Sequence, residues 1–165
     1  MKNTLNFIFF QIIWLITAFS AAHQLSIISV LCVGLAIVFY MKIAENPLNL
    51  LKLICFSAIF GFIIDTILIQ LHAFKVYGNT NISPLFMVGL WINFILTFDY
   101  SLSWIHRYFK LGVLLASVGG PLAYYSGAII GAITLNPSTL YSMTTIAIAW
   151  TVSMAILMKA YQKWH

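Results

Sequence analysis

Two carboxylates lie within long apolar runs of the sequence, and each is followed seven residues later by a histidine. Asp65 precedes His72, and Asp99 precedes His106. A charged side chain at the centre of a bilayer costs at least about 2.5 kcal/mol to insert, so such residues usually face a partner or a hydrated cavity. If these runs cross a membrane as helices, the seven-residue spacing places Asp65 and His72 on one helix face, two turns apart. They are then candidates for a proton relay that opens to the outer face. The structural alternative is an Asp65 that is bonded to a neighbouring helix.

Asp99 belongs to a second polar cluster, together with Ser103 and His106. Helical spacing would place these three side chains on one face of a helix. Arg107 and Lys110 follow closely, so we favour an ion-pair cluster at the membrane surface over a functional site. Both Asp–His segments read D-x-x-L-x-x-[LI]-H, but the match covers too few residues to indicate an internal repeat.

The composition of the chain indicates whether these carboxylates belong to a water-soluble protein or to a membrane protein. The 165-residue chain is 62% hydrophobic and 7% charged, whereas soluble domains average about 45–50% apolar and about 25% charged residues. This excludes a soluble globule and predicts an integral membrane protein. The basic residues are scattered singly, which argues against a nucleic-acid partner. No histidine pair has helical metal-binding spacing and the two cysteines form no CxxC motif, so no metal or cofactor is expected.

Six apolar stretches are long enough for membrane helices, which need about 20 mostly apolar residues. Polar or helix-breaking residues separate them, as at His23-Gln24, Glu45-Asn46-Pro47 and Asn136-Pro137-Ser138. The expected fold class is all-α: a polytopic bundle of six transmembrane helices that forms a single transmembrane domain over residues 1–165. The expected spans are approximately 5–22, 25–43, 50–73, 83–105, 110–134 and 139–160.

The basic residues predict the orientation of this bundle. In a six-span arrangement Lys75 lies on one side of the membrane, and seven other basic residues lie on the opposite side. Loops rich in Lys and Arg remain in the cytoplasm, so both termini are expected to be cytoplasmic. The seven residues are Lys2, Lys42, Lys52, Arg107, Lys110, Lys159 and Lys163.

Depth counting along the spans brings several polar and aromatic side chains to the middle of the bilayer. Tryptophan normally prefers the membrane interfaces, yet three of the five tryptophans lie at mid-depth in this arrangement. Two interpretations remain open: a ligand pocket with an aromatic wall, and a core network whose members satisfy one another. The candidate ligand-binding residues are Asp65, Asn93, Gln11, Trp14, Trp91, Tyr124, Tyr125 and Trp150.

The fifth span carries a stripe of small residues that is typical of close helix–helix association. Gly119-Gly120-Pro121 interrupts this stripe, and proline removes a backbone N–H and frees a carbonyl one turn earlier. A kink here is expected to help shape a cavity beside Tyr124. The stripe consists of Gly112, Ala116, Gly120, Gly127 and Gly131.

Several short motifs resemble a bacterial family of small multi-pass membrane proteins of unknown function. They are Asn6-Phe7 with Gln11 and Trp14, Ala21-Ala22-His23, Asp65 after a glycine-containing run, Ser101-Leu102-x-Trp104, and Gly119-Gly120-Pro121-Leu122-Ala123-Tyr124 with Gly127. Together these pieces cover most of the chain, and the Gly-Gly-Pro-Leu-Ala-Tyr piece is the most specific. The resemblance implies a bacterial inner membrane and a link to lipid modification. It supplies no catalytic residues.

Four functions remain open. The leading one is a binding or accessory protein for a lipid-like or small amphipathic ligand, with membrane lipid as its surroundings. The others are a small proton-coupled transporter that uses Asp65 and His72, a membrane enzyme with Asp65 or Asp99 as acid or base, and a structural subunit that packs through the glycine stripe. The sequence contains no zincin helix, nucleophile elbow or Walker loop, so we lean against an enzyme.

Overall fold

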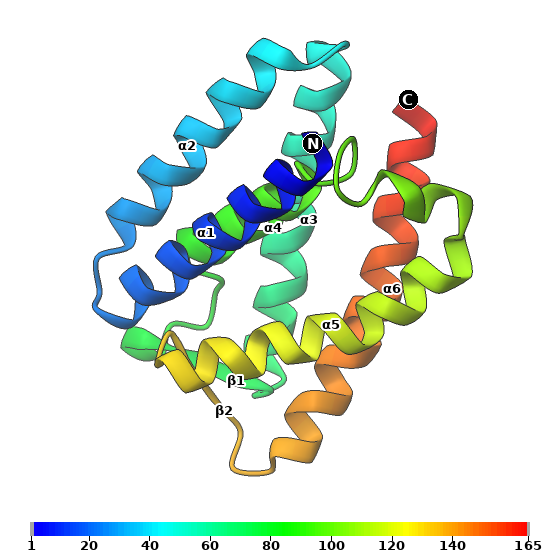
Figure 1. Cartoon of the computed structure of the whole chain (residues 1–165). Helices are drawn as coiled ribbons and strands as arrows, with labels where there is room; N and C mark the ends of the chain where they lie inside the picture. Colours follow the sequence, from blue (N-terminus) through cyan, green and yellow to red (C-terminus); the bar gives the residue numbers. More distant parts are fainter. Residues whose placement is uncertain (1, 165) are drawn as a thin grey trace.

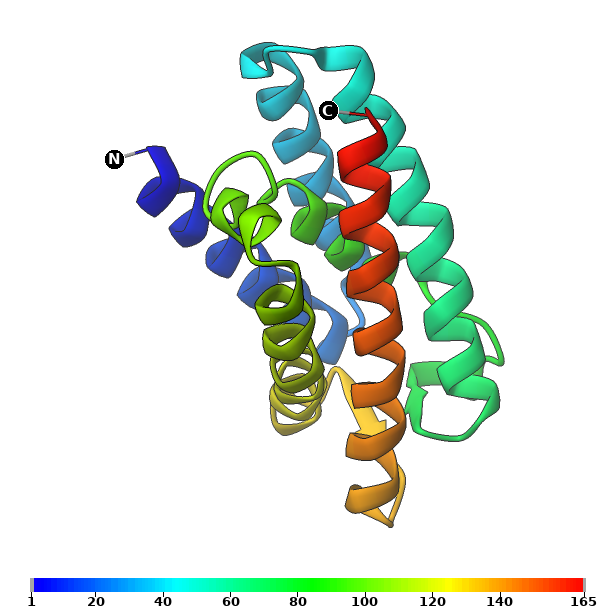
Figure 2. The same ribbon diagram turned by 90° about the vertical axis from the view of Figure 1, so that its right-hand side faces the viewer.

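The computed structural model describes residues 2–164, which contain six α-helices (Figure 1). The expected all-α fold class is confirmed. Both ends of the chain lie at the same end of the bundle, together with the turn between the second and third helices (Figures 1 and 2). The helices are α1 (Lys2–Ala22), α2 (Ser26–Ile43), α3 (Pro47–Gln70), α4 (Leu85–Ile95), α5 (Phe109–Ile130) and α6 (Thr139–Trp164).

Five of these helices are long and apolar enough to cross a membrane, and α4 is the shorter exception. Large apolar side chains such as Leu35 and Ile129 are more than two-thirds exposed on the outside of the bundle. Such a surface would be unstable in water and matches contact with lipid tails. Length, composition and surface together indicate a multi-pass membrane protein.

The fourth helix is the main departure from the expected boundaries. The sequence predicts a continuous helix over 83–105, but α4 ends at Ile95. Turns follow over 96–102, and a short 3₁₀ helix, η2 (Ser103–Arg107), leads into α5. Leu96, Thr97 and Phe98 are almost completely buried. The non-helical backbone that follows α4 is therefore enclosed by protein there, one of the settings in which such backbone is tolerated at membrane depth.

A small β-ribbon closes the end of the bundle opposite the termini. The strands β1 (Phe74–Val76) and β2 (Ile133–Leu135) pair antiparallel, and a 3₁₀ turn, η1 (Tyr77–Asn79), follows β1. The third span was expected to reach residue 73 and the fifth residue 134, but α3 ends at Gln70 and α5 ends at Ile130. Gly131 ends α5 with φ +91°, a left-handed conformation that glycine adopts without strain.

Two glycines of the small-residue stripe of α5 pack against α6 within the same chain. Gly112 lies against the side chain of Met158, and a Cβ at Gly120 would overlap the indole of Trp150. Pro121 lies inside α5, which remains a single helix across it. The stripe thus has a partner inside the bundle. Association with a second subunit through these residues stays a prediction.

The neighbouring glycines at 119 and 120 make a matched pair for testing this packing. We expect Gly120→Ala to lower the free energy of unfolding by about 1–3 kcal/mol, because the new methyl group overlaps a packed indole. Gly119 has no neighbour within 4 Å of an added Cβ, so Gly119→Ala should leave stability unchanged or slightly improved. Thermal melting of both variants in detergent measures the difference, and equal melting temperatures would contradict the packing account.

Candidate functional site

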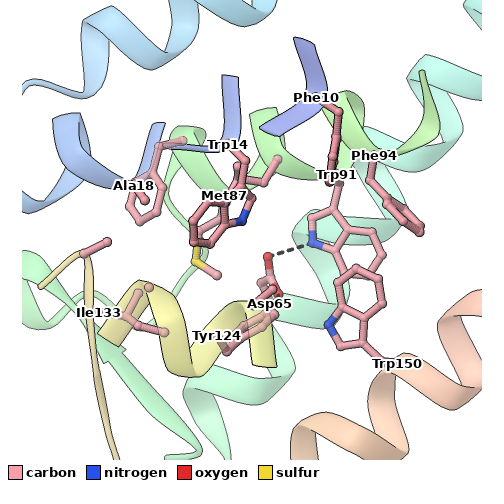
Figure 3. A pocket seen from close by; sticks show the side chains of 15 residues that line it. Phe10, Trp14, Ala18, Asp65, Met87, Trp91, Phe94, Tyr124, Ile133 and Trp150 are labelled. Carbon is pink, nitrogen blue, oxygen red and sulfur yellow. Dashed lines mark hydrogen bonds between the residues drawn. The ribbon is translucent and has the colours of Figure 1, made fainter. Parts of the chain in front are cut away.

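Asp65 is the buried polar centre of the bundle. Its side chain lies on α3 and has no exposed surface. One carboxylate oxygen accepts a hydrogen bond from Nε1 of Trp91 on α4 at 2.8 Å, and the other accepts one from the hydroxyl of Tyr124 on α5. Figure 3 shows both side chains converging on the carboxylate. One acidic group therefore joins three helices through two uncharged donors.

Glycines on two helices leave space for the aromatic side chains of this centre. Trp91 and Trp150 stack with ring centroids 4.8 Å apart and planes 11° from parallel. A Cβ at Gly61 would overlap Trp91, and a Cβ at Gly120 would overlap Trp150. Gly61 is one helical turn before Asp65, on the same face. The glycine therefore admits the indole whose N–H reaches the carboxylate.

A cavity of about 80 Å³ lies beside this centre (Figure 3). A cavity needs a volume of about 10–15 Å³ to hold one water molecule. The space beside Asp65 is therefore large enough for several waters or for part of a larger molecule. Its wall is aromatic and aliphatic except for Asp65, the Tyr124 hydroxyl and the indole nitrogens. The lining residues come from α1, α3, α4, α5 and α6 and from residues 132–133.

One polar atom at the cavity is left without a well-aligned partner. Nε1 of Trp150 is buried and makes no hydrogen bond of good geometry with any described residue, and the Tyr124 hydroxyl is near enough for only a weak, poorly aligned one. An unbonded buried donor costs about 1–3 kcal/mol. The site therefore has an unused donor beside an apolar space, which is suited to an oxygen atom of a ligand.

The structure brings together five of the eight residues predicted to bind a ligand. Asp65, Trp14, Trp91, Tyr124 and Trp150 all line the cavity. They come from five helices, so the depth estimate was accurate enough to group residues that are distant in the sequence.

The other three predicted residues lie outside the cavity. Asn93 is buried, but its side-chain amide donates to the backbone oxygen of Phe10 at 3.0 Å and so ties α4 to α1. Gln11 and Tyr125 are exposed on the outer surface. For Gln11 and Tyr125, counting depth along the helix therefore did not identify the helix face on which the side chain lies.

His72 does not share a helix face with Asp65, and this part of the prediction is wrong. The helix ends at Gln70, and His72 adopts a left-handed conformation with φ +56° in the turn that follows. Its side chain is exposed, and its backbone oxygen accepts a hydrogen bond from Asn136. A proton relay between the two residues stays a prediction, without support from helical geometry.

The second polar cluster is held together by a residue that the sequence analysis missed. Asp99, Ser103 and His106 do not share a helix face, because α4 ends before them. Instead the hydroxyl of Tyr161 on α6 donates to Asp99 at 2.6 Å, and its ring stacks on His106 with centroids 3.8 Å apart. Ser103 donates to the backbone oxygen of Tyr100. Spacing along one segment could not identify a partner on a distant helix.

Asn6 is a second residue whose role was missed. Its amide nitrogen donates to the Tyr40 hydroxyl at 2.7 Å and to the Leu96 carbonyl at 3.1 Å. Its amide oxygen accepts hydrogen bonds from the backbone N–H and the hydroxyl of Ser101. Asn6 thus bonds the non-helical segment that follows α4. The signal available in the sequence was a polar residue near the start of an apolar run, which indicates a side chain that needs hydrogen-bond partners inside the bundle.

A family model described as "Protein of unknown function (DUF2878)" matches residues 3–156. The chain belongs to this family. The expected membership in a family of unknown function is therefore confirmed. No curated protein and no solved structure is significantly similar to the chain. The DUF2878 assignment brings no activity with it, so function must be argued from the cavity and its chemistry.

No metal centre is visible in the described part of this DUF2878 chain. Across residues 2–164 no three His, Cys, Asp or Glu side chains lie close enough together to hold a metal ion. The polar groups of the Asp65 cavity can form hydrogen bonds with a ligand in otherwise apolar surroundings.

The adjacent tyrosines 124 and 125 allow the Asp65 centre to be tested. Tyr124→Phe removes one of two donors from a fully buried carboxylate, so we expect the free energy of unfolding to fall by about 1–3 kcal/mol. Tyr125 is 44% exposed, and Tyr125→Phe should change stability by less than about 0.5 kcal/mol. Equal effects of the two substitutions in thermal or denaturant melting would refute the role assigned to Tyr124.

Proposed function

We propose that the protein binds the polar end of a lipid-like or small amphipathic ligand in the Asp65 cavity of a six-span membrane domain. The observation that carries this proposal is the cavity itself, in which an acidic side chain and an unbonded indole N–H face an otherwise apolar space. Ligand pockets are typically apolar with a few polar groups that fix orientation. A bacterial inner membrane is the proposed location, with both termini in the cytoplasm.

The six-span arrangement is supported by the course of the chain. At about 1.5 Å per residue, α4 is about 16 Å long, so it covers about half of a 30 Å hydrocarbon core. The turns over 96–102 and η2 complete the fourth crossing. Lys75 lies in β1 at the end opposite the termini, and Arg107 and Lys110 lie where η2 leads into α5. The other five basic residues belong to helix segments near the end that holds both termini: Lys2, Lys42, Lys52, Lys159 and Lys163. This asymmetry favours cytoplasmic termini.

The size of the cavity limits what the ligand places there. Drug-sized ligands occupy about 300–1,000 Å³, several times the 80 Å³ beside Asp65. The space fits a polar group with a few carbons, such as a hydroxyl or ester. The rest of an amphipathic ligand would extend into the surrounding lipid. A hydroxyl could donate to Asp65, and an ester or hydroxyl oxygen could accept from Trp150 Nε1.

The orientation is testable with single cysteines. Cys32 and Cys55 are free, so both are first replaced by alanine. In intact cells a membrane-impermeant maleimide should label Ser138→Cys and Thr80→Cys. Lys163→Cys should react only after the membrane is permeabilised. Labelling of Lys163→Cys in intact cells would contradict the proposed orientation.

The cavity is testable through its own fluorescence, because three of the five tryptophans line it. The probe is a monoacylglycerol whose acyl chain carries bromine on carbons 2 and 3, beside the ester, since bromine quenches tryptophan on contact and only this end of the ligand fits the cavity. Titration of the detergent-solubilised protein should give saturable quenching. We expect Gly127→Leu, which extends a side chain from the cavity wall, to weaken the apparent affinity at least about tenfold, equivalent to about 1.4 kcal/mol.

Gly119→Leu is the matched control, because an added Cβ at Gly119 meets open space whereas Gly127 lines the cavity. This variant should bind as the wild type does. Asp65→Asn keeps the size of the side chain and serves as a second variant if Gly127→Leu fails to fold. Quenching that rises without saturation, or that is equal in all four proteins, would show partitioning into the micelle and reject the proposed function.

A further inference from the structure

A second and larger cavity, of about 660 Å³, lies at the end of the bundle that holds both termini. It is formed by the start of α1, the end of α2, the turn into α3, the non-helical segment after α4, and α6. It shares no lining residue with the Asp65 cavity. Its volume falls within the range of about 300–1,000 Å³ that is usual for whole small ligands.

The wall of this cavity includes a continuous row of aromatic rings. Phe9 and Phe39 have ring centroids 6.4 Å apart, Phe39 and Tyr40 are 5.3 Å apart, and Tyr40 and Tyr100 are 5.4 Å apart. All four residues line the cavity. The face of an aromatic ring carries partial negative charge, so such rows attract ammonium groups within about 6 Å.

Two of the chain's three acidic residues line the same cavity, although the net charge is +5. Glu45 is exposed in the turn between α2 and α3, and Asp99 is half-buried in the turns after α4. Both carboxylates lie close enough to Tyr100 to act on its hydroxyl electrostatically. Lys2 is the one basic residue among the lining residues that the structure describes. Acidic charge is therefore concentrated where basic charge dominates the surroundings.

We propose that this cavity is a binding site for an ammonium group, separate from the Asp65 cavity. The aromatic row and the two carboxylates both favour a cation, and the position at one end of an apolar bundle is at the level of lipid headgroups. Lys2 and the amides of Asn46 and Asn49 are placed for the phosphate that accompanies the ammonium in an aminophospholipid. A lipid headgroup and a free amine present the same chemistry to this site.

The test uses native mass spectrometry of the full chain in detergent with equimolar phosphatidylethanolamine and phosphatidylglycerol. The readout is the ratio of the two lipids that remain bound. We expect Glu45→Gln to lower the retained phosphatidylethanolamine-to-phosphatidylglycerol ratio about three- to tenfold, the range expected when an ion pair in aromatic surroundings is lost. Asp99→Asn should act in the same direction. Because Asp99 also bonds Tyr161, Glu45→Gln decides the question if Asp99→Asn is unstable.

Asn81→Lys is the control, since it raises the net charge by one, as Glu45→Gln does, at an exposed position outside both cavities, and it should leave the ratio unchanged. An unchanged ratio in Glu45→Gln and Asp99→Asn, or an equal fall in Asn81→Lys, would overturn the proposal. Failure of this test would leave the Asp65 cavity unaffected, because the quenching experiment uses an uncharged probe. Added ethanolamine distinguishes the two sources: displacement of the lipid identifies a free amine as a sufficient ligand, and retention assigns the site to the lipid headgroup.

Discussion

A backbone polar group in hydrocarbon must find its hydrogen-bond partner inside the protein, because the lipid supplies none. The segment from α4 to η2 shows how far this requirement shapes the chain. Helix α4 stops at Ile95, and continuous helical bonding is lost at the level of the bundle interior. Asn6 meets part of the deficit: its amide binds the Leu96 carbonyl and the Ser101 N–H. One side chain from α1 thus satisfies backbone groups of the non-helical segment that follows α4.

The same requirement explains the arrangement around Asp65. A carboxylate without partners would be prohibitively costly in the interior, so the bundle delivers one donor from α4 and one from α5. These donors can approach only because glycines leave room for the large rings beside them. The packing of α3, α4 and α5 is therefore set by the needs of a single acidic group. The cavity lies beside the large rings that pack around this group, and it includes the Trp150 N–H that has no well-aligned partner.

The sequence was sufficient to predict most of the fold. Apolar runs and their polar interruptions located α1, α2, α3, α5 and α6 to within a few residues, because the hydrophobic thickness of the bilayer sets the length of a spanning helix. Five of the cavity residues could be grouped for a related reason: side chains with polar atoms at mid-depth avoid contact with lipid tails and therefore face the interior of the bundle. Hydrophobicity carried no information about the end of α4, since Leu96, Thr97 and Phe98 continue the apolar run. That end depends on Asn6, 90 residues before Leu96 in the sequence.

The two cavities differ in the polar groups that they contain, and the difference follows from how deeply each cavity is buried. Beside Asp65 the polar partners are uncharged donors in a buried space, where a second charge would have to be desolvated at high cost. Around Glu45 and Asp99 the wall is partly exposed and near the end of the bundle, where a cation keeps part of its hydration and an aromatic face adds attraction. Helix α4 connects the two environments: Trp91 bonds Asp65, and the turns that begin at Leu96 carry Asp99 and Tyr100 to the second cavity. The early end of α4 is thus what allows one short helix to contribute to both sites.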